Sequence, residues 1–454
     1  MNKNDLITLT ITSITSEGHG VSKTDGFVFF VPFALLNEKV KCKVLKVKKN
    51  IVYCKLIEVL DSSPFRKKSD CPHFTKCGSC TLDNADYKLQ LEMKLLKVND
   101  AIKRIGKIDY NVTKIIPSPE IYNYRNKALI PVSYDKEGNL VCGFFRSRTH
   151  DVINMSDCLI QDKDAFLVAK KVYEWMIEYN IPAYNEETHT GIVRHIYFRK
   201  GIHTKEIMAG IVSYKKEIPY LDKLKESLLT IEGMASIIIN INPFNTNVIL
   251  GDEVICLYNE PYIKDKILEH TFKIGSKSFF QVNPYNVGNL YKQGIELLEI
   301  NKEDIVFDIY CGIGTIGLLC AENAKEVIGV EVVDEAIEYA KENAKINNIY
   351  NATFYTGKAE DKIKELILSE NKPTKVILDP PRAGCDESLI NEIINLSPQK
   401  ICYISCDVAT LARDLKIFTE SNKYKVEEII ACDMFPATSH IETVALLVRT
   451  DSVI

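Results

Sequence analysis

The sequence predicts an α/β protein with two smaller modules ahead of its main sheet, and the 454 residues show this in two ways. From about residue 300 onward, apolar runs alternate with helical patterns, which is typical of a doubly wound, mostly parallel sheet. Residues 5–60 instead hold about five short β-rich runs divided by turns, which favours a small barrel of the OB type. Residues 61–270 show both patterns and are expected to form a mixed α+β region.

Composition limits the kinds of protein that this chain can be. Hydrophobic residues make up 46% of it, and no apolar run approaches the roughly 18 to 20 residues that a membrane-spanning helix needs. The N-terminus lacks the apolar core of a signal peptide. We therefore expect a cytoplasmic protein that does not bind membranes, and we separately expect it to be a monomer. Most of the 14 cysteines should be reduced thiols, and clustered ones are candidates for metal binding or catalysis.

The net charge of −4 is divided unevenly along the chain. Residues 1–60 hold nine lysines and five acidic residues, so this segment carries +4 and the remainder −8. A basic module on an acidic body is compatible with RNA binding through one face, although a solvated strand face would look the same. Three basic-aromatic segments, residues 124–127, 144–148 and 194–200, offer side chains on which RNA bases stack, although exposed strand faces carry such residues too.

The elements expected before residue 270 follow from apolar periodicity. A polar linker occupies residues 61–70, and a helical pattern over Tyr87–Ile105 predicts an amphipathic helix. The remaining elements are one helix, Ala165–Asn180, and the strands Leu6–Ile14, Phe27–Val31, Val40–Lys48, Val52–Leu60, Ala128–Ser133, Leu140–Phe145, Ile192–Phe198, Glu206–Val212, Ser236–Ile241 and Asn247–Leu250.

The main sheet is expected to hold seven strands with helices between them. Two of the helices are predicted over Asp334–Ile346 and Glu387–Leu396. The strands are Ile305–Tyr310, Val327–Val333, Thr353–Tyr355, Val376–Leu378, Ile401–Ile404, Val426–Ala431 and Thr443–Val448.

One of these strands ends in Tyr403-Ile404-Ser405-Cys406-Asp407, and a helical segment follows directly. Ligands of open α/β sheets bind at the carboxyl ends of the strands. Cys406 is therefore a candidate reactive group at that edge, although most cysteines in protein interiors are inert buried thiols.

A glycine-rich segment, Asp308-Ile-Tyr-Cys-Gly312-Ile-Gly314-Thr315, leaves the first strand of the main sheet. With Gly317 it formally matches a dinucleotide-binding pattern, and Glu331 in the next strand suits the ribose hydroxyls of either adenosine-containing cofactor. Asp308 favours S-adenosylmethionine, because its carboxylate would repel a pyrophosphate. Asp379-Pro-Pro-Arg382 ends a later strand and is a further candidate for the site, with a rigid turn as the alternative.

Four motifs together resemble the RNA (uracil-C5)-methyltransferase family, and the resemblance runs essentially end to end. They are Phe280-Gln281-Val-Asn283, Asp379-Pro-Pro-Arg-Ala-Gly384, the Cys406 segment and His440-Ile-Glu442-Thr-Val444. The resemblance implies a TRAM-type OB domain at residues 1–60, a central α+β domain with an iron–sulfur site at 61–270, and a Rossmann-like, S-adenosylmethionine-dependent methyltransferase domain at 271–454. A helix at about 87–110 is expected to pack on the methyltransferase domain.

The resemblance also implies roles for single residues. Cys406 would be the nucleophile that adds to uracil C6, and Glu442 the base that removes the C5 proton. A solvated charge at a strand end is the alternative for Glu442. The expected ligands of S-adenosylmethionine are Gln281, Tyr310, Glu331 and Asp379.

Four cysteines match the family's ligands of an iron–sulfur cluster: Cys71, Cys77, Cys80 and Cys158. Four thiolates suit a [4Fe–4S] cluster. Zinc is the alternative metal, because tetrahedral sites of four cysteines are common, although zinc knuckles usually have two close cysteine pairs.

An iron–sulfur insert combined with a TRAM domain favours 23S ribosomal RNA as the substrate and 5-methyluridine as the product. The alternatives are the same reaction on transfer RNA and a non-catalytic RNA-binding factor.

Two positions depart from the family pattern. Phe33–Asn37 lacks the usual Pro-Gly turn, and Asp407 replaces the Asn that often follows the nucleophile, which adds a negative charge beside the thiol.

Overall fold

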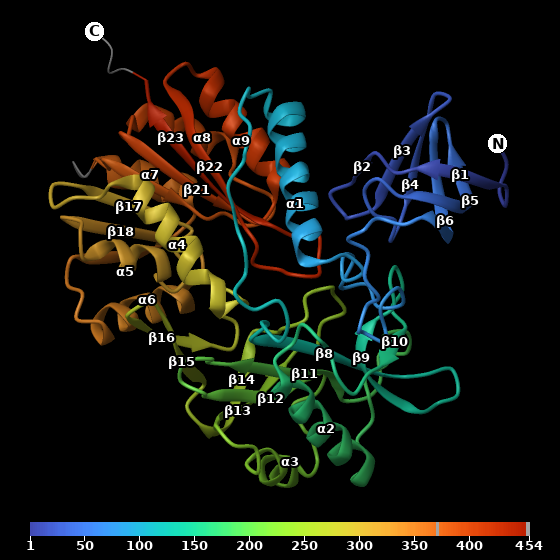
Figure 1. Cartoon of the computed structure of the whole chain (residues 1–454). Coiled ribbons are helices and arrows are strands. Elements are labelled where there is room, and N and C mark those ends of the chain that lie inside the picture. The colour runs from blue at the N-terminus through green and yellow to red at the C-terminus, as the bar shows by residue number, and fades with distance from the viewer. Residues whose placement is uncertain (369–371, 451–454) are drawn as a thin grey trace. The chain divides into compact units, whose positions relative to one another are not determined.

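The computed structural model describes residues 1–368 and 372–450 (Figure 1). The chain folds into two compact units. Unit 1 comprises Met1–Ile121 and Pro380–Ile454, and unit 2 comprises Tyr122–Asp379. No helix within the described ranges is both long enough and apolar enough to cross a membrane.

Unit 1 begins with a six-stranded sheet in the order β1-β5-β6-β4-β3-β2. Neighbouring strands run antiparallel except β4 and β6, which are parallel. The strands are β1 (Leu6–Thr10), β2 (Ser13–Ile14), β3 (Gly20–Thr24), β4 (Phe27–Val31), β5 (Lys39–Lys48) and β6 (Ile51–Asp61). The β-rich pattern of the N-terminal segment is thus observed, although the predicted strand Leu6–Ile14 divides into β1 and β2, and β3 lies between it and the predicted strand Phe27–Val31.

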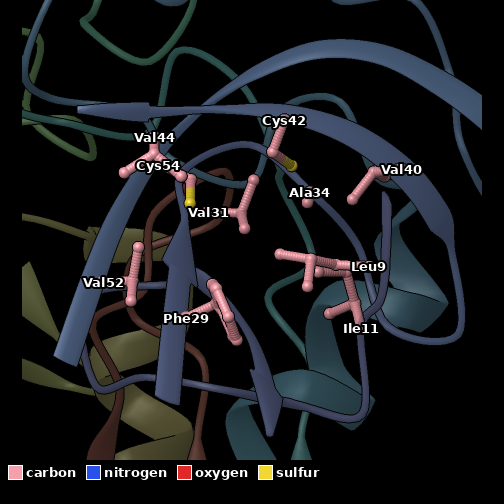
Figure 2. Packing of buried hydrophobic residues seen from close by; sticks show 10 residues of the cluster. All are labelled: Leu9, Ile11, Phe29, Val31, Ala34, Val40, Cys42, Val44, Val52 and Cys54. Atoms are coloured by element: carbon pink, nitrogen blue, oxygen red, sulfur yellow. The ribbon is translucent and has the colours of Figure 1, made fainter. Parts of the chain in front are cut away.

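This sheet encloses its own hydrophobic core. Figure 2 shows the buried side chains of β1, β4, β5 and β6 pointing toward one another. Because strand side chains alternate between two faces, Val40, Cys42 and Val44 of β5 are buried, whereas Lys39 is exposed and Lys41 is partly exposed. Lysines of β5 therefore lie on the outer face of the sheet.

The second part of unit 1 combines an N-terminal helix with the last strands of the chain. The helix α1 (Tyr87–Ala101) starts where the Asp86 carboxylate accepts a hydrogen bond from the backbone N–H of Leu89, and it ends in a π-helical turn, Ile102–Gly106. It packs against α9 (Val408–Glu420) (Figure 1). The strands follow the order β21-β23-β22-β7. They are β21 (Lys400–Ser405), β23 (Glu442–Arg449), β22 (Tyr424–Cys432) and β7 (Ile115–Ile116), and the helix α8 (Glu387–Leu396) precedes β21 in the chain.

Unit 2 contains a seven-stranded sheet in the order β10-β9-β8-β11-β12-β13-β14, in which only β12 and β13 pair in parallel. The strands are β8 (Lys127–Tyr134), β9 (Leu140–Phe145), β10 (Val152–Asn154), β11 (Val193–Lys200), β12 (Ile207–Ser213), β13 (Met234–Ile241) and β14 (Glu253–Asn259). Two helices, α2 (Lys163–Glu178) and α3 (Leu221–Leu228), pack on them.

The predicted strand Asn247–Leu250 is wrong, and the edge strand is β14 instead. The Asn242 side chain donates hydrogen bonds to the carbonyl oxygens of Val248 and Ile249 at 2.7 and 2.9 Å. A side chain that captures these carbonyls keeps the segment out of a β ladder. A hairpin of β15 (Tyr262–Ile267) and β16 (His270–Gly275), which the sequence reading missed, follows β14.

The rest of unit 2 alternates strands and helices as predicted. Four parallel strands lie in the order β19-β18-β17-β20. They are β17 (Ile305–Ile309), β18 (Glu326–Glu331), β19 (Ala352–Thr356) and β20 (Lys375–Leu378). The helices are α4 (Pro284–Leu298), α5 (Thr315–Ala321), α6 (Asp334–Ile346) and α7 (Ala359–Leu368).

Candidate active site and cofactor site

In unit 1, strand register brings Cys406 and Glu442 to the same end of two neighbouring strands. In the antiparallel pair β21 and β23, Ser405 lies opposite Thr443, whose Oγ1 donates a hydrogen bond to the Ser405 carbonyl oxygen at 3.1 Å. Continuing this register by one residue places Cys406 opposite Glu442. The Glu442 side chain is 3% exposed and Cys406 is half-buried. A thiol and a carboxylate thirty-six residues apart in the sequence are thus neighbours at one strand edge.

The junction between β21 and α9 holds Cys406 at a helix N-terminus. The Asp407 carboxylate accepts hydrogen bonds from the backbone N–H groups of Ala409 and Thr410 at 2.9 and 3.1 Å. The Ser405 hydroxyl donates to the Asp407 carbonyl oxygen at 3.0 Å, which tightens the turn. The positive end of a helix dipole favours an anion in this position, as a reactive thiolate requires.

The loop that follows Asp379 is fastened to α9 by a buried carboxylate. Asp414 accepts hydrogen bonds from the backbone N–H of Cys385 at 2.9 Å and the Tyr403 hydroxyl at 2.6 Å, and it pairs with Arg413 at 2.7 Å. Gly384 packs so closely here, with φ at 78°, that a Cβ would lie 2.5 Å from the Arg413 guanidinium. The motif therefore needs glycine at this position for steric reasons.

In unit 2, the glycine-rich loop between β17 and α5 forms an acidic cradle together with the carboxylates of Asp308 and Glu331. The backbone N–H of Gly317 donates to Asp308 at 2.8 Å, and that of Gly312 donates to Glu331 at 3.2 Å. Gly312 has φ at 54° and nothing within 4 Å of where a Cβ would be, so open space adjoins the backbone here. The cradle therefore leaves room for a ligand beside the loop.

The acidic groups of this cradle carry shifted pKa values. Burial, and to a lesser extent the charge of Glu331, raise the pKa of Asp308 to about 7, although the hydrogen bond from Gly317 acts in the opposite direction. Burial and the charge of Asp308 raise the pKa of Asp379 to about 7. Asp308 Oδ1 is buried and has no hydrogen-bond partner among the described residues. A cationic ligand would relieve this repulsion, so the residues fit the positively charged end of S-adenosylmethionine.

The other two expected cofactor ligands are Tyr310, at the start of the glycine-rich loop, and Gln281, in the segment that precedes α4. Tyr310 directly follows β17 with φ at 69°, and its backbone N–H donates to the Val330 carbonyl oxygen at 2.9 Å. Gln281 is 3% exposed, and the Asn126 side chain donates to its carbonyl oxygen at 3.2 Å. Unit 2 therefore contains all four expected ligands: Gln281, Tyr310, Glu331 and Asp379.

Every residue of the basic-aromatic segment 194–200 except Lys200 is buried, which contradicts its interpretation as an RNA-facing patch, and Tyr124 and Asn126 of the segment 124–127 are buried too. Tyr124 and Tyr197 are 0% exposed, and Arg199 is 3% exposed. The Arg199 guanidinium donates hydrogen bonds to the carbonyl oxygens of Gly275 and Ser278, both at 2.8 Å. Arg199 and Tyr197, whose hydroxyl donates to the Ser276 carbonyl oxygen at 2.9 Å, thus hold the loop that leads to Gln281. The sequence pattern could not distinguish this role from an exposed basic strand face.

The proposed cluster ligands are not gathered within either unit. Cys71, Cys77 and Cys80 are half-buried in unit 1, and Cys158 is buried in unit 2. Burial raises the pKa of Cys71, and the nearby Cys77 adds to this increase. Among the described residues, no group of three or more His, Cys, Asp or Glu side chains is arranged to hold a metal ion. The thiol donors suit an iron–sulfur cluster chemically.

The parallel strands, the glycine loop and the acidic cradle define an α/β methyltransferase that uses S-adenosylmethionine. The chain belongs to the tRNA (uracil-5-)-methyltransferase family, whose profile matches residues 86–450, and a TRAM domain profile matches residues 3–57. It is therefore an RNA methyltransferase of the uracil-5 family. The predicted methyltransferase fold, TRAM domain and S-adenosylmethionine dependence are confirmed.

Individual relatives agree with this family over nearly the whole chain. The chain is 41% identical to an uncharacterized RNA methyltransferase of Halalkalibacterium halodurans, over 98% of each chain, and 42% identical to one of Clostridium acetobutylicum, over 99% of this chain and 98% of that one. Among solved structures, it is similar to the Pyrococcus abyssi tRNA (uracil-54, C5)-methyltransferase in complex with S-adenosyl-L-homocysteine. The TM-score is 0.79 at 30% identity, with 97% of this chain and 99% of that chain covered.

We expect S-adenosylmethionine to bind more weakly as the pH falls from about 8 to about 6. Asp308 and Asp379, whose pKa values are raised to about 7, lose their negative charge over this interval, whereas the sulfonium keeps its positive charge. The dissociation constant should rise by about tenfold per pH unit below 7 for each proton taken up. Calorimetric titration at several pH values checks this.

S-adenosylhomocysteine is the control ligand for this titration, because its thioether is uncharged and the rest of the molecule is the same. Its affinity should depend less on pH, and Asp308→Asn should reduce the pH dependence for S-adenosylmethionine. Equal pH dependences of the two ligands in the wild-type protein would contradict the assignment of these carboxylates.

Proposed function

We propose that this protein methylates C5 of a uridine in 23S ribosomal RNA through a covalent adduct between Cys406 and uracil C6. The observation that carries the proposal is the register of β21 and β23, which sets a thiol at a helix N-terminus beside a buried carboxylate. A nucleophile and a base within reach of one another are what this chemistry requires.

Uracil C5 is a poor nucleophile, and the proposed role of Cys406 is to activate it. The thiolate sulfur forms a bond to C6, and the electron pair of the C5–C6 double bond moves into an enolate that includes C5 and O4. S-adenosylmethionine would supply the electrophilic methyl group, and as C5 takes it up the methyl–sulfur bond breaks and S-adenosylhomocysteine leaves. A cysteine suits the first step because its thiolate is both a strong nucleophile and a fair leaving group.

Glu442 is proposed to complete the reaction as the base. After methylation, C5 still carries its original proton, which the carboxylate accepts. The electrons of the broken C–H bond restore the C5–C6 double bond as the C6–S bond breaks, and the thiolate is released. Gln281, Tyr310, Glu331 and Asp379 are proposed to hold the methyl donor during these steps.

The choice of 23S ribosomal RNA over transfer RNA rests on the resemblance to iron–sulfur enzymes with a TRAM domain. In the six-stranded sheet, the outward lysines of β5 offer phosphate contacts that either RNA could use. The similar structure from Pyrococcus abyssi is a transfer-RNA enzyme, which favours the alternative substrate. We also propose that the domains divide at residues 60 and 270 and that the protein is a cytoplasmic monomer.

The substrate is tested by mapping 5-methyluridine by mass spectrometry in RNA from a deletion strain. We expect one or more uridines of 23S ribosomal RNA to lose the methyl group and to regain it when the wild-type gene is restored. Loss confined to transfer RNA would assign the alternative substrate. If the purified protein methylates neither RNA, it is a non-catalytic RNA-binding factor.

A [4Fe–4S] cluster is part of this proposal, with Cys71, Cys77, Cys80 and Cys158 as the residues that would hold it. Four thiolates would leave no open iron, so the cluster would have a structural role and no chemistry of its own. Iron and sulfide contents of anaerobically purified protein decide between this cluster and zinc.

A further inference from the structure

Lys97 is a half-buried lysine of α1 to which none of the roles above applies. Its Nζ donates a hydrogen bond to the Ser439 carbonyl oxygen at 2.9 Å. Ser439 lies three residues before Glu442, in the segment between β22 and β23. Lys97 therefore ties α1 to the segment that leads to the proposed base.

The ammonium group of Lys97 lies among charged groups from α1 itself, from the segment after Asp379 and from the junction of β21 and α9. Burial lowers its pKa to about 8, and the attraction of Asp407 opposes this change. Lys94 and Arg382 repel the ammonium, whereas Cys406 attracts it. Lys97 is therefore mostly protonated at neutral pH, and its charge acts on the junction of β21 and α9.

The role of Asp407 as the N-cap of α9 does not require its negative charge. Its carboxylate caps α9 through the N–H groups of Ala409 and Thr410, and an Asn side chain would cap the helix equally well. The additional negative charge directly follows Cys406 and opposes the formation of a thiolate there. A compensating positive charge would remove this disadvantage.

We propose that Lys97 is a positioning residue of the methyl-transfer reaction, whose charge offsets that of Asp407 and favours the Cys406 thiolate. Its hydrogen bond to Ser439 also holds the segment that leads to Glu442. This inference rests on the proposed nucleophile and base. A lysine that only anchors α1 is the alternative that the experiment has to exclude.

The test is the rate at which iodoacetamide alkylates Cys406 as a function of pH. Trypsin releases this cysteine in the peptide Ile401–Arg413, where fragmentation by mass spectrometry separates it from the buried Cys402. Lys97→Met should move the pH midpoint of alkylation upward by about 0.5 to 1 unit, which slows the reaction by about threefold to tenfold below the midpoint.

A double-mutant cycle with Asp407→Asn separates the charge effect from a packing effect. The Asp407→Asn protein should keep its helix cap and show a lower midpoint, and the double variant should return close to the wild-type value. Lys97→Arg should behave like the wild type. Lys103→Met, which removes an exposed lysine just after α1, is the matched control and should leave the profile unchanged.

An unchanged midpoint in Lys97→Met would overturn the proposal, even if methylation were slower, because that result is expected of an anchoring residue alone. Alkylation needs neither RNA nor methyl donor, so this outcome is independent of the proposed function. The proposed function fails separately, if the wild-type protein methylates no uridine in RNA.

Discussion

Cys406→Ala is expected to reduce methyl transfer to RNA by at least about a thousandfold, because the proposed reaction depends on nucleophilic attack by this thiol on uracil C6 and alanine has no nucleophilic group. The variant should still bind S-adenosylmethionine, since the acidic cradle belongs to unit 2. Transfer of a radioactive methyl group to RNA measures the loss. Alanine is smaller than cysteine at a half-buried position, so the fold should be preserved.

Cys256→Ala is the matched control, because Cys256 is exposed on β14 in unit 2 and is expected to be dispensable.

Glu442→Gln tests the proposed base. It keeps the shape and the hydrogen-bonding capacity of the side chain but cannot accept the C5 proton, so the methylated adduct should persist and migrate with the protein under denaturing conditions. Methylation by Cys406→Ala at the wild-type rate would exclude this thiol as the nucleophile. Free, unmodified RNA as the only species with Glu442→Gln would refute the role of the base.

Lys94→Met is expected to lower the stability of unit 1 by about 3 to 5 kcal/mol, because it leaves a carboxylate buried without its ionic partner. Lys94 is 1% exposed, and its Nζ lies 2.6 Å from Asp433 and 2.9 Å from the Phe435 carbonyl oxygen. Burial lowers the pKa of Lys94, and the carboxylate of Asp433 opposes that change. This ion pair joins α1 to the segment directly after β22.

Hydrogen exchange in peptides that cover α1 measures this effect, because the single tryptophan, Trp175, lies in unit 2 and does not report on unit 1. Lys88→Met, at an exposed position of the same helix, should change the stability by no more than about 0.5 kcal/mol. Adding Asp433→Asn to Lys94→Met should recover part of the loss, since no charge then remains buried. Equal protection of α1 in Lys94→Met and Lys88→Met would show that the pair is dispensable.

Local sequence was sufficient to predict the strand–helix alternation after residue 300, because each strand there is a short apolar run bounded by polar turns. Local sequence also predicted the glycine-rich loop, since closely spaced glycines after an apolar strand are typical of a backbone that approaches a ligand closely. The predicted strand Asn247–Leu250 is a case in which local sequence was misleading. Its residues suit a strand, but the side chain of Asn242 binds its carbonyl groups in a pattern that periodicity does not reveal.

Burial of polar residues is a second property that local pattern could not supply. Segments rich in arginine and tyrosine look alike whether they face water or support a loop, and Arg199 is buried because carbonyl groups of a distant loop accept its hydrogen bonds. Asn126 likewise holds Gln281 across 155 positions in the sequence. Only the pairing of distant segments determines these contacts.

The sequence by itself indicated the candidates for chemistry: a cysteine at the end of a strand, an aspartate and a glutamate around a glycine loop, and a second glutamate near the end of the chain. The tertiary structure alone decided which of them meet. Antiparallel pairing of β21 with β23 brings Glu442 to Cys406, and packing of α1 on α9 brings the charge of Lys97 to Asp407. The physical reason is that strand register and helix packing depend on the burial of many apolar side chains at once, which no single motif encodes.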